Sequence, residues 1–135
     1  MSGQITDQHR ELYAAAEAAA GNAYVPYSKF RVGAALLASD GTVFTGCNVE
    51  NSSFGLTICA ERNACTSAVA AGIRSFDAIA VHVDLPDGQP CGACRQFLSE
   101  FGLQLEVVYR RGGELVVCTL AELLPDAFVP AALPT

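Results

Sequence analysis

The sequence predicts an α/β fold with three layers, in which a mixed five-stranded sheet carries helices on both faces. This prediction rests first on the order of helical and extended segments, which reads α-β-β-α-β-α-β-β. It also rests on length, because 135 residues can build a real hydrophobic core but are too few for two domains. We therefore expect residues 1–135 to form a single domain.

The first helix is predicted from its capping residue and its alanines. Thr6 or Asp7 caps a run rich in alanine, the best helix former, and Gly21-Asn22 ends it. Two apolar runs that favour β-structure follow, over residues 30–37 and 42–47. The Asp-Gly dipeptide between these runs is typical of the turn of an antiparallel hairpin.

Glycine and proline delimit most of the remaining elements. The expected order is a loop over 48–58, a helix over 59–71, a strand over 76–83, a helix over 92–101, and strands over 103–109 and 114–118. Gly72 and Gly102 end the two helices. Thr119 and Glu122 match a capping box for a last short helix, which Pro125 ends.

Composition and charge narrow the class of protein. Hydrophobic residues make up 51% of the chain but never form a run of about eighteen, so no transmembrane helix is expected. The N-terminus lacks the basic start and apolar run of a signal peptide, which favours a cytoplasmic location, where clustered thiols bind metals more often than they form disulfides. The net charge of −6 argues against a partner rich in phosphate. We expect neither a nucleic acid nor a membrane as partner.

Three cysteines and a glutamate carry the most specific signal in the chain. Cys91 and Cys94 are three residues apart at a predicted helix start, so they face the same side, and Cys59 begins another helix. The unpaired N–H groups of a helix start favour thiolates. A structural zinc site normally has four protein ligands, whereas a catalytic site keeps one position for water. Three thiolates with Glu61 nearby therefore predict a site that activates water, and Arg62 is placed to donate hydrogen bonds to a thiolate.

The residues alone leave another metal site open. A structural zinc could take Glu61 or a distant histidine as its fourth ligand. His9 and His82 are each more typical of surface or core residues, because neither belongs to a spaced pair. The remaining cysteines are expected to be small core residues: Cys47, Cys65 and Cys118.

The segments from Cys59 to Arg62 and from Pro90 to Gln96 together resemble the small zinc-dependent cytidine deaminases. The resemblance extends over nearly the whole chain, from residues 25–30 to residues 123–128. With cysteine rather than histidine as the first zinc ligand, the chain is similar to the branch that acts on free nucleosides. The resemblance implies a cytidine deaminase-like fold, one zinc ion per chain on the three cysteines, and a homotetramer.

The resemblance also implies a reaction, the hydrolytic deamination of cytosine at C4 in pyrimidine salvage. Zinc acidifies a water molecule, and Glu61 carries protons to N3 and then to the departing amino group, which leaves as ammonia. Asn48 and Glu50 would point to the same face of a strand-like stretch and match the residues that bind the ribose 3′-hydroxyl. Because these contacts avoid the 2′ position, cytidine and 2′-deoxycytidine are both expected as substrates. The residues that would contact the base are Phe30, Ala60 and Phe128.

Two alternatives remain beside this interpretation. One is a related deaminase for a larger cytosine nucleoside, such as an aminonucleoside antibiotic. Glu50 argues against this alternative, because its carboxylate is needed to bind a plain ribose. The other is a zinc-binding module without catalytic activity.

Phe54 stands in an otherwise polar loop, where many relatives have tyrosine. The resemblance implies that this loop reaches the site of a neighbouring subunit.

Overall fold

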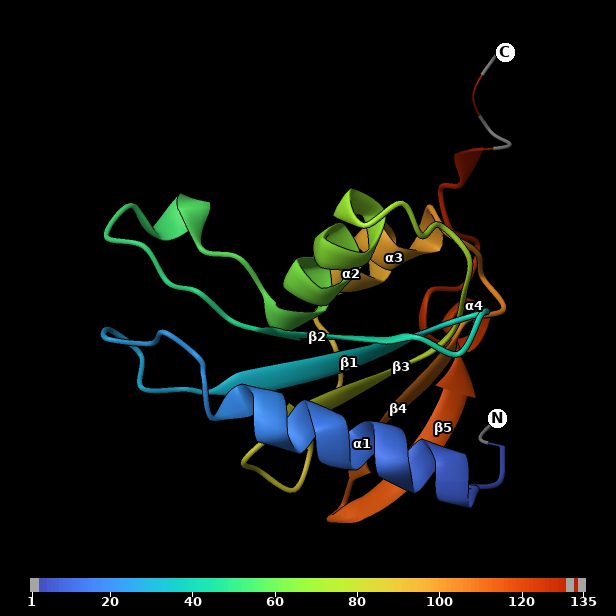
Figure 1. The fold of residues 1–135 in the computed structure, drawn as a ribbon, viewed down its shortest axis with the longest axis horizontal. Helices are drawn as coiled ribbons and strands as arrows, with labels where there is room; N and C mark the ends of the chain where they lie inside the picture. The colour runs from blue at the N-terminus through green and yellow to red at the C-terminus, as the bar shows by residue number, and fades with distance from the viewer. Residues whose placement is uncertain (1–2, 131–132, 134–135) are drawn as a thin grey trace.

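A mixed five-stranded sheet forms the centre of the computed structural model, which describes residues 3–130 and 133 (Figure 1). Its strands are β1 (Val32–Ala38), β2 (Val43–Cys47), β3 (Phe76–Val83), β4 (Glu106–Arg111) and β5 (Glu114–Thr119). They lie in the order β2-β1-β3-β4-β5, with β3 and β4 parallel and the other neighbours antiparallel. Strands β1 and β2 form the predicted hairpin. The predicted mixed five-stranded sheet is confirmed as well.

Helices cover both faces of this sheet and complete the three predicted layers. Helix α1 (Asp7–Ala20) lies on one face, and α2 (Ala60–Ala70) and α3 (Gly92–Ser99) lie on the other, while the short α4 (Leu120–Leu123) follows β5 (Figure 1). Each face has its own hydrophobic cluster because side chains alternate along a strand. In β1, Ala35 and Leu37 pack with α1, whereas Ala34 and Leu36 pack beneath α2 and α3.

None of the helices in the described part of the chain is both long and apolar enough to cross a membrane.

Capping boxes begin two of the helices. At α1 the Thr6 hydroxyl accepts a hydrogen bond from the His9 backbone N–H, and His9 Nδ1 accepts one from the Thr6 backbone N–H. His9 also binds β4 through its Nε2 atom, which lies 2.9 Å from Glu106 Oε1. The predicted box of Thr119 and Glu122 is present at α4. These reciprocal bonds satisfy N–H groups that a helix start leaves unpaired.

Strand β4 begins later than predicted. The sequence favours a strand from Leu103, but pairing starts at Glu106. The carbonyl groups before that point are already engaged, because Leu105 O accepts from Leu120 N at 2.8 Å and Leu103 O accepts from Ala121 N at 2.9 Å. The segment therefore satisfies the first N–H groups of α4 instead of extending the sheet.

The turn between β4 and β5 is tighter than the predicted four-residue connection. Both strands continue to a two-residue turn at Gly112 and Gly113, whose φ angles are +59° and +84°. Glycine adopts such left-handed conformations without steric cost, so a Gly-Gly pair suits this tight turn.

Two glycines allow helices to lie directly on the hairpin of β1 and β2. A Cβ atom on Gly33 would lie 2.0 Å from the carbonyl oxygen of Ala16 in α1. A Cβ atom on Gly46 would lie 2.5 Å from both the carbonyl oxygen of Ala60 and the nitrogen of Ala64 in α2. Neither position has room for a larger residue, so the backbone of β2 fixes how closely the first turn of α2 approaches the sheet.

Candidate active site

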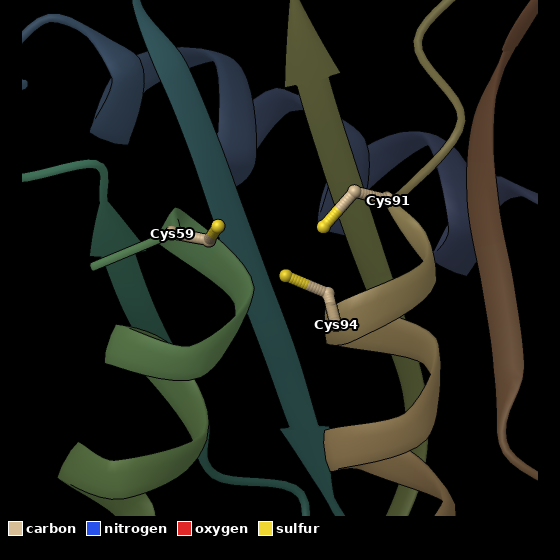
Figure 2. Close-up of side chains that lie close together, drawn as sticks. All are labelled: Cys59, Cys91 and Cys94. Carbon is tan, nitrogen blue, oxygen red and sulfur yellow. The ribbon is translucent and has the colours of Figure 1, made fainter. Parts of the chain in front are cut away.

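Three cysteine sulfurs converge between the starts of α2 and α3. Cys59 is the N-cap residue of α2, Cys91 is that of α3, and Cys94 lies in the first turn of α3. Figure 2 shows the three side chains pointing toward one another from these two helices. Their sulfur atoms all lie within 4.8 Å of one another. Tetrahedral zinc with Zn–S bonds of about 2.3 Å separates two sulfurs by roughly 3.8 Å, so a small closure would bring these ligands to bonding distance.

The sulfur cluster includes neither histidine nor Glu61. Among the described residues only the three cysteines meet at this point, which leaves a fourth coordination position for a small molecule. His9 caps α1 and His82 is buried in β3, as expected of core or surface residues. A closed site with a histidine or Glu61 as its fourth ligand therefore has no support in the geometry.

The remaining cysteines lie away from the cluster. Cys65 and Cys118 are buried in the hydrophobic layer beneath α2 and α3, as predicted, and Cys47 is partly buried at the end of β2. Burial raises the pKa of the Cys65 thiol to about 11, which keeps it protonated and unreactive near neutral pH.

Hydrogen bonds within the cluster prepare one sulfur for metal binding. The thiol of Cys94 donates to Cys59, and this bond, reinforced by Arg62, lowers the pKa of Cys59 to about 5. The same bond holds the pKa of Cys94 above its usual range, because Cys94 keeps the shared proton. A metal that binds here must displace that proton, so affinity should fall at low pH.

Arg62 lies against the cluster, where the sequence predicts it. One terminal nitrogen of its guanidinium group lies 3.4 Å from the sulfur of Cys59 and donates to it. Its Nε atom is buried and has no hydrogen-bond partner among the described residues. The contact places a positive charge beside the thiolate and offsets part of the excess negative charge that three thiolates would bring.

Glu61 is almost completely buried, with 4% of its surface exposed. Removal from water raises the pKa of its carboxyl group, and the neighbouring Cys59 thiolate raises it further. A carboxyl group with a raised pKa exchanges protons more readily near neutral pH than an ordinary glutamate does. The burial that penalises the charge therefore also suits the group to proton transfer.

A pocket of about 300 Å³ opens beside the cluster, and we call it the thiol pocket. The predicted site residues that line it are Phe30, Asn48, Cys59, Ala60, Glu61 and Cys91. Val32, Val81 and Val83 contribute apolar surface, and residues 87–89 line it from the loop before α3. An apolar pocket with a few polar groups suits a flat heterocyclic ring.

Asn48 has a structural role in addition to its place in the thiol pocket. Its Oδ1 accepts from the backbone N–H of Val32 at 2.9 Å, and its Nδ2 donates to the carbonyl of Phe30 at 2.8 Å. These bonds hold the start of β1 and fix the backbone that carries Phe30. A primary amide still has a second N–H and a second lone pair for a ligand.

Glu50 lies outside the lining of the thiol pocket. It lines an adjoining hollow of about 340 Å³ with Tyr27, Ser28, Phe54 and Thr57, and Thr57 lines both spaces. Its carboxylate accepts from the backbone N–H groups of Tyr27 and Ser28 at 3.0 and 3.1 Å, and from the Ser28 hydroxyl. The bonds from Ser28 lower the pKa of Glu50, so the carboxylate is ionised and held in place.

The two aromatic residues predicted from the outer loops remain at the surface. Phe128 is 62% exposed and lies outside the thiol pocket, although Gln96 of α3 donates to its carbonyl oxygen at 2.8 Å. Phe54 is 74% exposed, and its ring meets Tyr27 edge to face with 5.7 Å between centroids. Both side chains are therefore exposed for contact with another molecule and do not line the thiol pocket.

Arg95 has no predicted role, yet it holds the loop that carries a zinc ligand. Its Nε donates to the carbonyl of Pro90 at 2.8 Å, and a terminal nitrogen donates to the carbonyl of Leu123 at 2.8 Å. These bonds fix the peptide immediately before Cys91 and join it to the end of α4. The position of Arg95 in the sequence could have indicated this role, because an arginine one turn into a helix can reach back to the loop before that helix.

The comparisons with known proteins agree with this site. The family model for the cytidine and deoxycytidylate deaminase zinc-binding region matches residues 6–110. The chain belongs to this family. A cytidine deaminase of Sporosarcina psychrophila is 51% identical over 121 residues, which cover 87% of this chain and 89% of that protein.

Solved structures of cytidine deaminases share the fold. The crystal structure of cytidine deaminase from Burkholderia pseudomallei superimposes with a TM-score of 0.85 at 53% identity, covering 92% of this chain and 100% of the other. That from Mycobacterium tuberculosis gives 0.77 at 42% identity, covering 92% and 98%. The predicted cytidine deaminase-like fold and the zinc centre of Cys59, Cys91 and Cys94 are thus confirmed.

Gly46→Ala is expected to lower zinc affinity by about tenfold or more, because the added methyl group must push the first turn of α2, and with it Cys59, away from α3. Gly33→Ala is the matched control, since it adds the same methyl group against α1, which carries no zinc ligand. It should lower the free energy of unfolding by about 1–3 kcal/mol and leave zinc affinity unchanged. Competition with a chelator and thermal unfolding measure the two effects. Equal losses of zinc affinity in both variants would show that Gly46 acts only through general stability.

In the metal-free protein, Glu61→Gln is expected to raise the free energy of unfolding at pH 7. The pKa of Glu61 is higher in the folded than in the unfolded state, so the wild type loses stability as pH rises from the ordinary value of 4.5 through the raised value. Glutamine carries no such penalty, and its advantage should vanish below pH 4.5. Urea unfolding at both pH values measures the difference, with exposed Glu100→Gln as control. An unchanged stability at pH 7 would argue against a raised pKa of Glu61.

Proposed function

We propose that this protein deaminates free cytidine and 2′-deoxycytidine, giving uridine or 2′-deoxyuridine and ammonia. It is a zinc-dependent cytidine deaminase, and the observation that carries this conclusion is the burial of Glu61 beside three converging thiols in a pocket of nucleobase size. The relatives that cover most of the chain bear the same name. A zinc-binding module without activity would need neither the pocket nor a buried carboxyl group.

The reaction divides between the metal and Glu61. Zinc held by the three cysteines supplies a Lewis acid that makes water nucleophilic near neutral pH. Glu61 takes a proton from the attacking water and gives it to N3 of cytosine, which makes C4 electrophilic. It then transfers the second proton to the amino group, so that the C4–N bond breaks and ammonia leaves. A raised pKa suits Glu61 to both transfers.

The nucleoside is bound at both of its ends. Phe30 and the valines of the thiol pocket pack on the pyrimidine, and the backbone at Ala60 orients its amino group. Asn48 binds the ribose 3′-hydroxyl together with Glu50, whose place in the adjoining hollow fits a sugar that extends beyond the thiol pocket. Phe128 packs over the bound pyrimidine from the C-terminal tail.

The charges around the thiol pocket favour a nucleoside over a nucleotide. In the part of the chain that the structure describes, no lysine or arginine lines this pocket, whereas Glu61 and Asp87 do. Recognition of a phosphate group usually depends on such cations or on a helix N-terminus. The starts of α2 and α3 are committed to the sulfur cluster.

An assay of ammonia release tests the proposed activity. The zinc-loaded protein should deaminate cytidine and 2′-deoxycytidine, and a chelator should abolish turnover. Glu61→Gln should retain zinc but lose at least about 10²–10⁴-fold in turnover, because an amide cannot carry the proton. Near-normal turnover in a metal-loaded Glu61→Gln variant would exclude the assigned role. Absence of turnover by the zinc-loaded wild type on both nucleosides would exclude the function itself.

We also propose a cytoplasmic location and a single-domain organisation for residues 1–135. The location rests on thiol chemistry, because the three cysteines bind metal only when they are reduced, as cytoplasmic thiols are. The organisation rests on the shared sheet, since both layers of helices pack on the same five strands.

A homotetramer completes the proposal. Large apolar side chains are exposed around the loop between β2 and α2, which contains a short 3₁₀ helix, η1 (Phe54–Leu56). The exposed members of this patch are Tyr24, Tyr27, Val49, Phe54, Leu56 and Ile58. Contiguous apolar surface of this kind marks an interface. Phe54 of one chain packs against the site of a neighbour.

Phe54→Ala is expected to shift the assembly toward smaller species and to lower activity in parallel, because it removes an aromatic side chain from the centre of the patch. Val43→Ala is the control, since Val43 is exposed but lies at the start of β2, outside the patch. Light scattering gives the mass of each species, and cytidine turnover is measured on the same samples. A fully active wild-type monomer would contradict the tetramer and the shared site.

A further inference from the structure

The loop between β3 and α3 forms one wall of the thiol pocket without regular secondary structure. Asp87, Gly88 and Gln89 line the pocket, and Cys91 follows two residues after Gln89. Ordering an irregular segment costs backbone entropy of about 1–2 kcal/mol per residue, so such a wall needs bonds to something outside itself.

The end of β4 and the turn after it supply two of these bonds through their backbone. Gly88 N donates to the carbonyl of Arg110 at 3.0 Å, and Gly113 N donates to the carbonyl of Pro86 at 3.0 Å. Loop and turn therefore lie side by side, although more than twenty residues separate them in the sequence.

One side chain adds a third bond. Oδ1 of Asp87 accepts from the backbone N–H of Gly112 at 2.9 Å. A carboxylate oxygen is a good acceptor for a backbone N–H group. With Gly112 and Gly113 in left-handed conformations, the N–H groups of both residues bond to the loop.

The turn is itself attached to the framework of the fold. The guanidinium group of Arg110 donates through Nε to the hydroxyl of Tyr13 in α1 at 2.8 Å. That hydroxyl lies 2.7 Å from Nδ1 of His82 in β3. Arg110, whose carbonyl holds Gly88, is thus fixed to α1 on one face of the sheet and to β3 within it, so the end of β4 and the turn after it form a rigid support for the pocket wall.

We propose that Asp87 is a positioning residue for the deaminase. By accepting the hydrogen bond of Gly112, it holds the loop of residues 84–90 in the conformation that shapes the thiol pocket. Without this bond the loop would sample conformations that do not bind nucleoside. Apparent affinity falls in proportion to the population of the competent state, whereas turnover at saturation is preserved. The inference rests on the proposed function, because it concerns the same pocket.

Three variants of the zinc-loaded protein test this role. Asp87→Ala should raise KM for cytidine roughly tenfold, with kcat within about twofold of wild type and zinc content unchanged. Asp87→Asn keeps an oxygen acceptor and should restore most of the affinity. Asp84→Ala removes the same charge from the same loop, where the carboxylate lies near Arg110, but leaves the hydrogen bond of Gly112 to Asp87 in place. Its KM should therefore rise much less than that of Asp87→Ala. Because Asp87 is exposed, all three variants are expected to fold.

Hydrogen–deuterium exchange provides a readout that does not depend on activity. The amides of Gly88, Gly112 and Gly113, which are hydrogen-bonded between the loop and the turn, should exchange faster in Asp87→Ala than in wild type, while Asp84→Ala leaves them protected. The inference would be overturned if Asp87→Ala had the KM and the exchange rates of the wild type. It would also be overturned if Asp87→Asn were as impaired as Asp87→Ala, because the charge of Asp87 rather than its hydrogen bond would then be responsible. An inactive wild type would instead refute the proposed function, and exchange would still decide whether Asp87 holds the loop.

Discussion

The convergence of two helix starts on one point is the constraint on which the rest of this structure depends. Three sulfurs can share one ion only if α2 and α3 begin within a few ångströms of each other. The distance between α2 and the sheet is set by Gly46, where β2 leaves no space for a side chain. The start of α3 is held by Arg95, which binds the carbonyl just before Cys91. The zinc centre is therefore a property of backbone packing as much as of the cysteines.

The same convergence explains the electrostatics of the site. A helix start, a neighbouring thiol and Arg62 all favour a thiolate at Cys59. Glu61 also receives support from Cys94 and Arg62, but its almost complete burial outweighs them, and with the Cys59 charge beside it the pKa of Glu61 rises. Two acidic groups only two residues apart are thus driven in opposite directions. This divergence separates the group that holds metal from the group that moves protons.

Local patterns were enough to predict most of the fold. The capping residues of α1 and α4, the hairpin of β1 and β2, and the spacing of Cys91 and Cys94 all depend on neighbours in sequence, and these predictions agree with the structure. The late start of β4 could not be predicted in this way, because the carbonyls of Leu103 and Leu105 accept hydrogen bonds from α4, which begins at Leu120.

The site shows the same division. Zinc ligands follow from spacing and from the family resemblance, whereas the supporting contacts join distant segments. Asn48 was predicted as a sugar ligand, but its bonds to the start of β1 depend on how the hairpin lies. The separation of Glu50 from the thiol pocket depends on Ser28, more than twenty residues earlier. Such contacts have no signature in a single sequence.

The sulfur cluster also has a consequence for the redox durability of the protein. A low-pKa thiolate at Cys59 lies close to the exposed Cys91, and these are the partners that an oxidant needs to form a disulfide. A bound metal occupies the sulfur electrons that such a reaction would use. Losing zinc therefore removes a cofactor and also leaves an oxidisable pair of thiols at the mouth of the pocket, so metal occupancy sets how long the site survives outside a reducing compartment.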